Sequence, residues 1–151
     1  LLSRRFYKRK RNMIWHIFYT ASTGEISWST SGDISEEIKS HQNEAYGLSY
    51  KQVNYDDMPD PELYYLNDNT DLSTKNIFNP TFSSDNWTID STISVTGLPA
   101  GTEVFLDGVS KGTMSDTTLN LNINESGIYV LMFKKVDYRT WSMKKHTVKA
   151  T

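Results

Sequence analysis

The stretch LPAGTEVFLDGVSKGT, residues 98–113, carries the clearest structural signal of the sequence. Two strand-like segments, EVFL and VSKGT, flank an Asp107-Gly108 pair, and such a pair favours a tight hairpin turn because both central residues can adopt a positive φ. The turn formers Pro99 and Gly101 precede the first segment. We interpret this stretch as a folding device and predict no catalytic function for it.

The segments that follow it also predict strands. In TTLNLNIN, residues 117–124, the apolar side chains alternate with asparagines, which is the period of a half-buried strand. IYVLMF, residues 128–133, is apolar on both faces and predicts a central strand covered from both sides. TWSMKKHTVKA closes the chain as a last strand. Strand segments that recur every eight to twelve residues between turn signals are typical of a β-sandwich.

The first half of the chain predicts a smaller unit. IWHIFY at 14–19 and EISWS at 25–29 are strand-like, and Gly24 between them suits the positive-φ position of a hairpin loop. Further strands are expected at 47–54, 63–68 and 72–75. Pro80 restrains both itself and the residue before it, so we place a domain boundary there.

A short helix is expected after the hairpin. Asp33 and Glu36 have the spacing of a capping box, and Ile34 and Ile38 share one face of a helix of about eight residues. We expect it to end near Gln42 and Asn43. The predicted fold class is mainly β, with a basic arm (1–12), a small hairpin-helix-sheet anchoring module (13–79) and an antiparallel sandwich (80–151).

Composition excludes several classes of protein. The chain of 151 residues has no cysteine, so disulfide frameworks and thiolate metal sites are excluded. No apolar run approaches the roughly 20 residues of a membrane helix. The opening residues lack the apolar region of a secretory signal. Neither membrane insertion nor signal-directed secretion is predicted.

Charge is distributed unevenly. The net charge is -2, yet the first twelve residues hold six basic side chains and no acid. Such an arm can contact phosphates or lipids, or dock on the acidic surface of a neighbouring subunit. We favour subunit docking over nucleic acid. Met13 is also a natural start residue, in which case the arm would lie outside the natural product. The basic residues are Arg4, Arg5, Lys8, Arg9, Lys10 and Arg11.

Candidate chemistry is sparse. The three histidines, His16, His41 and His146, lack the spacing of a metal-binding helix. One carboxylate cluster lies in a loop with two prolines, and it could bind Ca²⁺ or act as a glycosidase pair. A solvated acidic loop is the interpretation we favour, and we predict no catalytic residue, cofactor or metal. The cluster consists of Asp56, Asp57, Asp60 and Glu62.

Four tryptophans raise a different alternative. Exposed aromatic faces stack on sugars, so Trp87 and Trp141 of the second half could bind a glycan. Tryptophans in or beside strands are more often buried in a core or an interface. We therefore assign the aromatic residues of the first hairpin, together with the arm, to assembly contacts. These residues are Trp15, Phe18, Tyr19 and Trp28.

In the second half, turn residues stand at fixed offsets from apolar strand residues, at Pro99, Gly101, Val104, Asp107, Gly108, Gly112, Gly127, Tyr129, Phe133, Tyr138 and Trp141. This pattern resembles the PEGA-type and immunoglobulin-like (Ig-like) β-sandwich repeats of envelope and virion proteins. Residues 13–150 as a whole resemble small bacteriophage tail proteins, through FYTASTGEI, YYLND, FNP and ISVTGLPAGTEVFLDG. The resemblance implies a non-enzymatic, tail-associated virion subunit with an Ig-like domain. Its expected partners are other virion proteins and further copies of itself in a symmetric assembly. A capsid decoration protein and a host-receptor or glycan-binding module are the alternatives.

Overall fold

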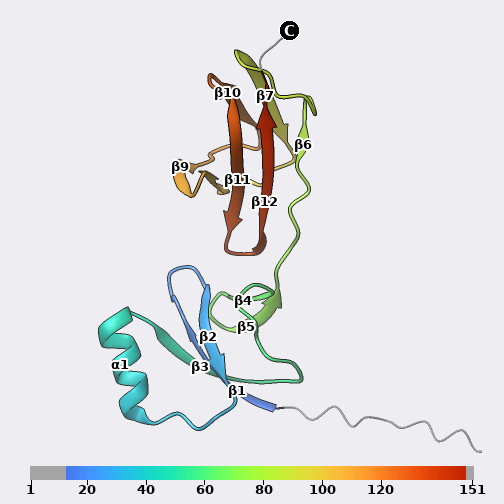
Figure 1. Cartoon of the computed structure of the whole chain (residues 1–151). Coiled ribbons are helices and arrows are strands. Elements are labelled where there is room, and N and C mark those ends of the chain that lie inside the picture. Colours follow the sequence, from blue (N-terminus) through green and yellow to red (C-terminus); the bar gives the residue numbers. More distant parts are fainter. Residues whose placement is uncertain (1–12, 149–151) are drawn as a thin grey trace, which may run out of the picture. The chain divides into compact units, whose positions relative to one another are not determined.

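A computed structural model describes residues 13–148, and the chain divides into two compact units, 1–74 (unit 1) and 75–151 (unit 2) (Figure 1). Twelve strands and one helix lie in the described residues. The predicted mainly-β fold class is confirmed. In that part of the chain no helix is long and apolar enough to cross a membrane.

Unit 1 is built on a three-stranded antiparallel sheet in the order β2-β1-β3. The predicted hairpin is confirmed, with Gly24 at φ +78°. A Cβ at Gly24 would stand 2.0 Å from the carbonyl oxygen of Leu66, whose amide donates to the Gly24 carbonyl at 2.9 Å. Only glycine fits this contact. The strands are β1 (Met13–Tyr19), β2 (Ile26–Thr30) and β3 (Ser49–Tyr55).

The helix α1 spans Glu36–Tyr46, so the predicted start and end were both wrong. Ser35, not Asp33, is the N-cap, and its hydroxyl accepts from the amide of Ile38. The helix continues through Asn43 because the residue that can end it lies further on. Gly47 adopts the left-handed conformation at φ +66°, and its amide donates to the carbonyl of Asn43.

The two faces of this sheet pack against different elements. On one face α1 contributes Gln42, which accepts from the indole of Trp28 at 3.1 Å, while Trp28 stacks on Phe18 at 4.3 Å. On the other face Ile17 packs against Leu66 of a second hairpin. That hairpin consists of β4 (Tyr64–Asn67) and β5 (Asp71–Thr74).

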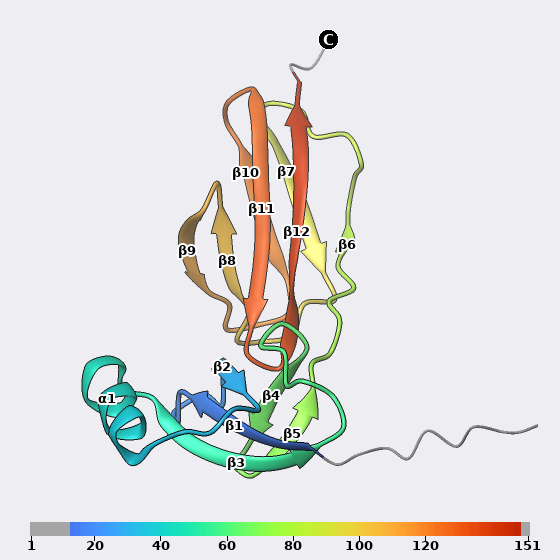
Figure 2. The same ribbon diagram turned by 60° about the horizontal axis from the view of Figure 1, so that its bottom comes forward.

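Unit 2 consists of two antiparallel sheets that pack face to face (Figure 2). The three-stranded sheet has the order β10-β7-β6 and the four-stranded sheet the order β12-β11-β8-β9. The Asp107-Gly108 turn joins β8 to β9, with φ of +50° and +80°. The strands are β6 (Thr81–Phe82), β7 (Ser91–Thr96), β8 (Glu103–Leu106), β9 (Val109–Thr113), β10 (Leu119–Ile123), β11 (Gly127–Lys135) and β12 (Tyr138–Thr147).

The core of unit 2 lies between the sheets. Leu131 and Phe133 of β11 are fully buried against Ile93 and Val95 of β7. The expectation that β11 is covered from both sides was wrong, because Ile128 on its outer face is 64% exposed. The unit is therefore a two-layer sandwich with one solvent-facing side to each sheet.

The segment before β6 belongs to unit 2. The amide of Asn76 donates to the carbonyl of Asp137 at 2.8 Å, and Phe78 is buried beside Phe133 and Tyr138. The predicted boundary at residue 80 therefore lies five residues inside unit 2, since Phe78 joins the core of the sandwich.

Candidate functional site

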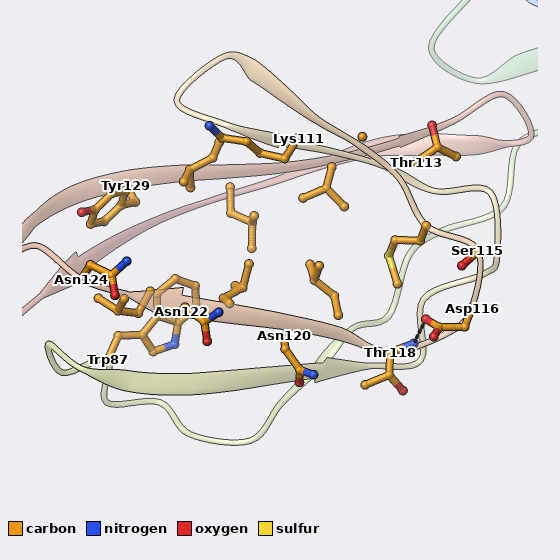
Figure 3. A pocket seen from close by; sticks show the side chains of 18 of the residues that line it. Trp87, Lys111, Thr113, Ser115, Asp116, Thr118, Asn120, Asn122, Asn124 and Tyr129 are labelled. Atoms are coloured by element: carbon orange, nitrogen blue, oxygen red, sulfur yellow. Dashed lines mark hydrogen bonds between the residues drawn. The ribbon is translucent and has the colours of Figure 1, made fainter.

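A groove of about 750 Å³ opens along one side of the sandwich, between β9 and β10 (Figure 3). Both strands are the edges of their sheets. Its floor consists of apolar side chains that point between the two layers, and it is therefore an opening into the core of unit 2. The floor residues are Val104, Leu106, Met114, Leu119, Leu121, Ile123 and Leu131.

The groove follows from the strand count of the two sheets. Four strands face three, and β9 and β10 meet on the same side of the sandwich. At the opposite side the edges β6 and β12 are aligned, since Phe82 stacks on Trp141 at 5.8 Å, so the four-stranded sheet extends one strand beyond its partner at β9. Among the floor residues, Leu119 and Leu121 stay partly exposed, while Leu131 is fully buried.

The rim of the groove is polar. Lys111 and Thr113 lie on one side, and Asn120 and Asn122 lie on the other (Figure 3). Asp116 closes one end, where its carboxylate accepts from the amide of Thr118 at 3.2 Å.

At the other end Tyr129 donates its hydroxyl to the carbonyl of Glu125 at 3.0 Å. An apolar floor within a polar rim favours a ligand that buries apolar groups on the floor and satisfies polar groups at the rim.

The aromatic residues assigned to assembly have roles inside the chain. Phe18 is fully buried, and Trp15 and Tyr19 are 9% and 8% exposed. Trp28 is held between Phe18 and the helix by its stacking contact and its hydrogen bond to Gln42. They form the interior of unit 1, which leaves little of their surface for a partner. The basic residues of the arm, Arg4 to Arg11, lie outside the described residues.

The titratable candidates are not brought together. His16 bonds to the hydroxyl of Tyr50 through Nδ1, and His41 contacts the ring of Tyr46. In the acidic loop Asp60 accepts from the amide of Glu62 at 2.9 Å, which is the bond of a tight turn. Within residues 13–148, no group of three or more histidines and acids is placed to hold a metal ion.

The tryptophans of unit 2 do not form an exposed platform. Trp87 is 2% exposed, and its indole donates to the carbonyl of Ser84 at 3.2 Å. Trp141 stacks on Phe133 at 4.9 Å and on Phe82 at 5.8 Å. The glycan alternative thereby loses the two side chains on which it rested.

Comparisons with known proteins give no match to a family model, a curated protein or a solved structure. The Ig-like assignment therefore stays a prediction. The sequence did not predict the groove. The one pattern that points to it is LNLNI at 119–123, a strand without charge or proline whose apolar residues alternate with asparagines.

Proposed function

We propose that this protein is a non-enzymatic structural subunit of a bacteriophage particle, associated with the tail, that is held in place by protein contacts. The groove between β9 and β10 is the observation that carries the proposal. It combines an apolar floor with two edge strands, and edge strands are surfaces to which other chains add. Its role in the particle is to receive a segment of a neighbouring subunit.

The division of charge supports an assembly role as well. Residues 13–74 hold two basic and eleven acidic side chains, a net charge of -9, whereas residues 1–12 carry +6. Opposite charges of this size on one chain attract between copies and steer their encounter. Many weak identical contacts then add up in a symmetric particle.

Immunoelectron microscopy of intact particles tests this proposal. Antibodies raised against the full chain are expected to label particle tails from cells that carry the gene. Label on heads would instead assign the chain to capsid decoration. Particles that contain no detectable copy of the chain, by label and by mass spectrometry, would contradict the proposal.

A further inference from the structure

We infer that β10 is a docking edge for a single extended segment of another virion protein, which pairs with β10 as a fourth strand of the β10-β7-β6 sheet and packs apolar side chains into the groove. This inference rests on the proposed function and specifies the partner and the mode of binding at the same groove.

The backbone groups of β10 that face away from β7 can be identified. Asn120 lies opposite Ser94, and the backbone of Ser94 is already engaged on its other side. Its carbonyl accepts from the amide of Ser83 at 2.9 Å, and its amide donates to the Ser83 hydroxyl at 2.9 Å. The Asn120–Ser94 pair is therefore a non-hydrogen-bonded pair of the antiparallel ladder.

Hydrogen-bonded and non-hydrogen-bonded pairs alternate along an antiparallel ladder, so Asn122, two residues after Asn120, is also in a non-hydrogen-bonded pair. Both residues therefore direct their backbone amides and carbonyls toward the free edge of β10. Leu121 lies between them and pairs with Ile93, so its backbone amide and carbonyl are directed toward β7. The side chains of Asn120 and Asn122 accept hydrogen bonds from the hydroxyls of Ser94 and Thr92 at 2.9 and 3.0 Å on the outer face of the sheet.

The other sandwich edges are protected, within the described part of unit 2. The strand β6 has two residues. The strand β9 carries Lys111 and a register shift against β8. The strand β12 carries three basic residues and is bridged by Asn76 and Thr88 near its two ends. Short length, charge, bulges and covering segments are the devices that keep edges from pairing with other chains.

By contrast β10 has none of these devices. LNLNI contains no charge and no proline, and its five residues pair with β7 in one uninterrupted register. Directly beside its free edge lies the groove, whose floor includes Leu106 and Leu131. A strand that pairs with β10 would direct every second side chain onto this floor.

The same geometry argues against a second copy as the occupant. In a dimer formed by pairing of β10 with β10 of a second copy, the two β9 strands would clash, because β9 extends beyond β10 in each copy. A single extended segment avoids this clash. With that segment bound as a fourth strand, the β10-β7-β6 sheet would have as many strands as the sheet that it faces.

Charge specifies the ends of the segment. Asp116 precedes β10 and Glu125 follows it, while the strand itself is neutral. A complementary segment has about five uncharged residues, apolar at alternate positions, with basic residues on both sides. Five residues of strand span roughly 17 Å.

A synthetic peptide with these properties, Lys-Lys-Val-Thr-Val-Thr-Val-Lys-Lys, tests the inference by calorimetric titration of the full chain. Asn122→Pro removes one edge amide, and a proline is tolerated at an edge position whose amide faces solvent. We expect Asn122→Pro to weaken peptide binding at least tenfold. The matched control Asn122→Ala, which keeps the amide and loses the same side chain, should stay within twofold of the parent. Equal urea midpoints would show that both variants fold.

Several outcomes would overturn the inference and leave the result of the immunoelectron microscopy, which tests the proposed function, unchanged. Equal binding by Asn122→Pro and the parent would show that the groove takes its ligand without strand pairing. No binding of the peptide to the folded parent at millimolar concentration would remove the docking edge itself. Dimerisation that Asn122→Pro abolishes would identify a second copy. A tenfold tighter, Asn122-dependent complex with a peptide of residues 1–12 would identify the arm as the occupant.

Discussion

The two units solve the problem of burying apolar surface in different ways. Unit 2 has one continuous core, with nine buried side chains from both sheets and the segments that join them. Unit 1 divides its apolar residues between the two faces of a small sheet. Four buried residues lie on the face that packs against the β4–β5 hairpin, and the Phe18–Trp28–Tyr50 ring contacts lie on the face toward α1. A divided interior offers fewer mutually supporting contacts than a single one.

Charge separates the units as well. Residues 75–151 hold eight basic and seven acidic side chains, a net charge of +1, whereas residues 1–74 have a net charge of -3, made up of -9 in residues 13–74 and +6 in residues 1–12. Like charges repel within a compact unit and lower its stability. We therefore expect the stability of residues 13–74 to depend more on the ionic environment than that of unit 2.

The largest expected effect comes from the core of the sandwich. Phe133 is fully buried and stacks on Trp141. Phe133→Ala should destabilise unit 2 by about 3–5 kcal/mol, because it leaves a cavity between the sheets. Urea unfolding followed by NMR, which resolves the two units, measures this. Ile128→Ala on the same strand, where the side chain is 64% exposed, should cost less than about 0.5 kcal/mol.

A contact inside unit 1 gives the next effect. Gly24→Ala would bring a Cβ to 2.0 Å from the Leu66 carbonyl oxygen, in addition to the strain of a positive φ. The loss of stability should exceed the roughly 1–2 kcal/mol of a left-handed alanine. Gly47→Ala is the matched control, because its φ is also positive but nothing lies within 4 Å of its Cβ. Equal losses for the two variants would contradict the close approach of the two hairpins.

Salt should distinguish the units. Raising the ionic strength from about 0.01 to 0.15 M shortens the Debye length from roughly 30 to 8 Å. Unit 1 should gain stability, on the order of 1 kcal/mol or less, because its excess of acids is screened. Unit 2 should change less. A gain confined to unit 2 in the same NMR-detected unfolding experiment would refute the charge comparison.

The smallest effect concerns one ammonium group of α1. The hydrogen bond to Glu36 raises the pKa of Lys39 above its ordinary value of 10.5, with partial burial opposing the rise. A raised pKa means that protonated Lys39 stabilises the folded state below pH 10.5 and that this contribution is lost as the pH rises through the folded-state pKa. NMR titration of the Lys39 side chain should show a lower pKa in Glu36→Gln, and an unchanged pKa would exclude Glu36 as the cause.

Local signals in the sequence predicted local structure well. The alternation at 119–123 and the Asp107-Gly108 pair specify a strand and a turn by their own chemistry, and both are present. The helix cap was misplaced because Asp33 and Ser35 are both competent caps, and the choice depends on how α1 packs against Trp28 and Tyr50.

The groove could not be predicted in the same way. It arises from the number of strands in each of two sheets and from which edges coincide, and neither is encoded in a single segment. The hairpin aromatics show the same limit. Their pattern indicates a buried surface, but whether Phe18 is covered by a partner or by α1 is decided by tertiary packing.

Amide hydrogen exchange on the free chain tests the open edge of the sandwich most directly. The account predicts that the amides of Asn120 and Asn122 exchange faster than that of Leu121 by about tenfold or more, since Leu121 is bonded to β7 and the other two face the groove. Uniform protection along β10 would contradict it, because the edge would then already have a partner.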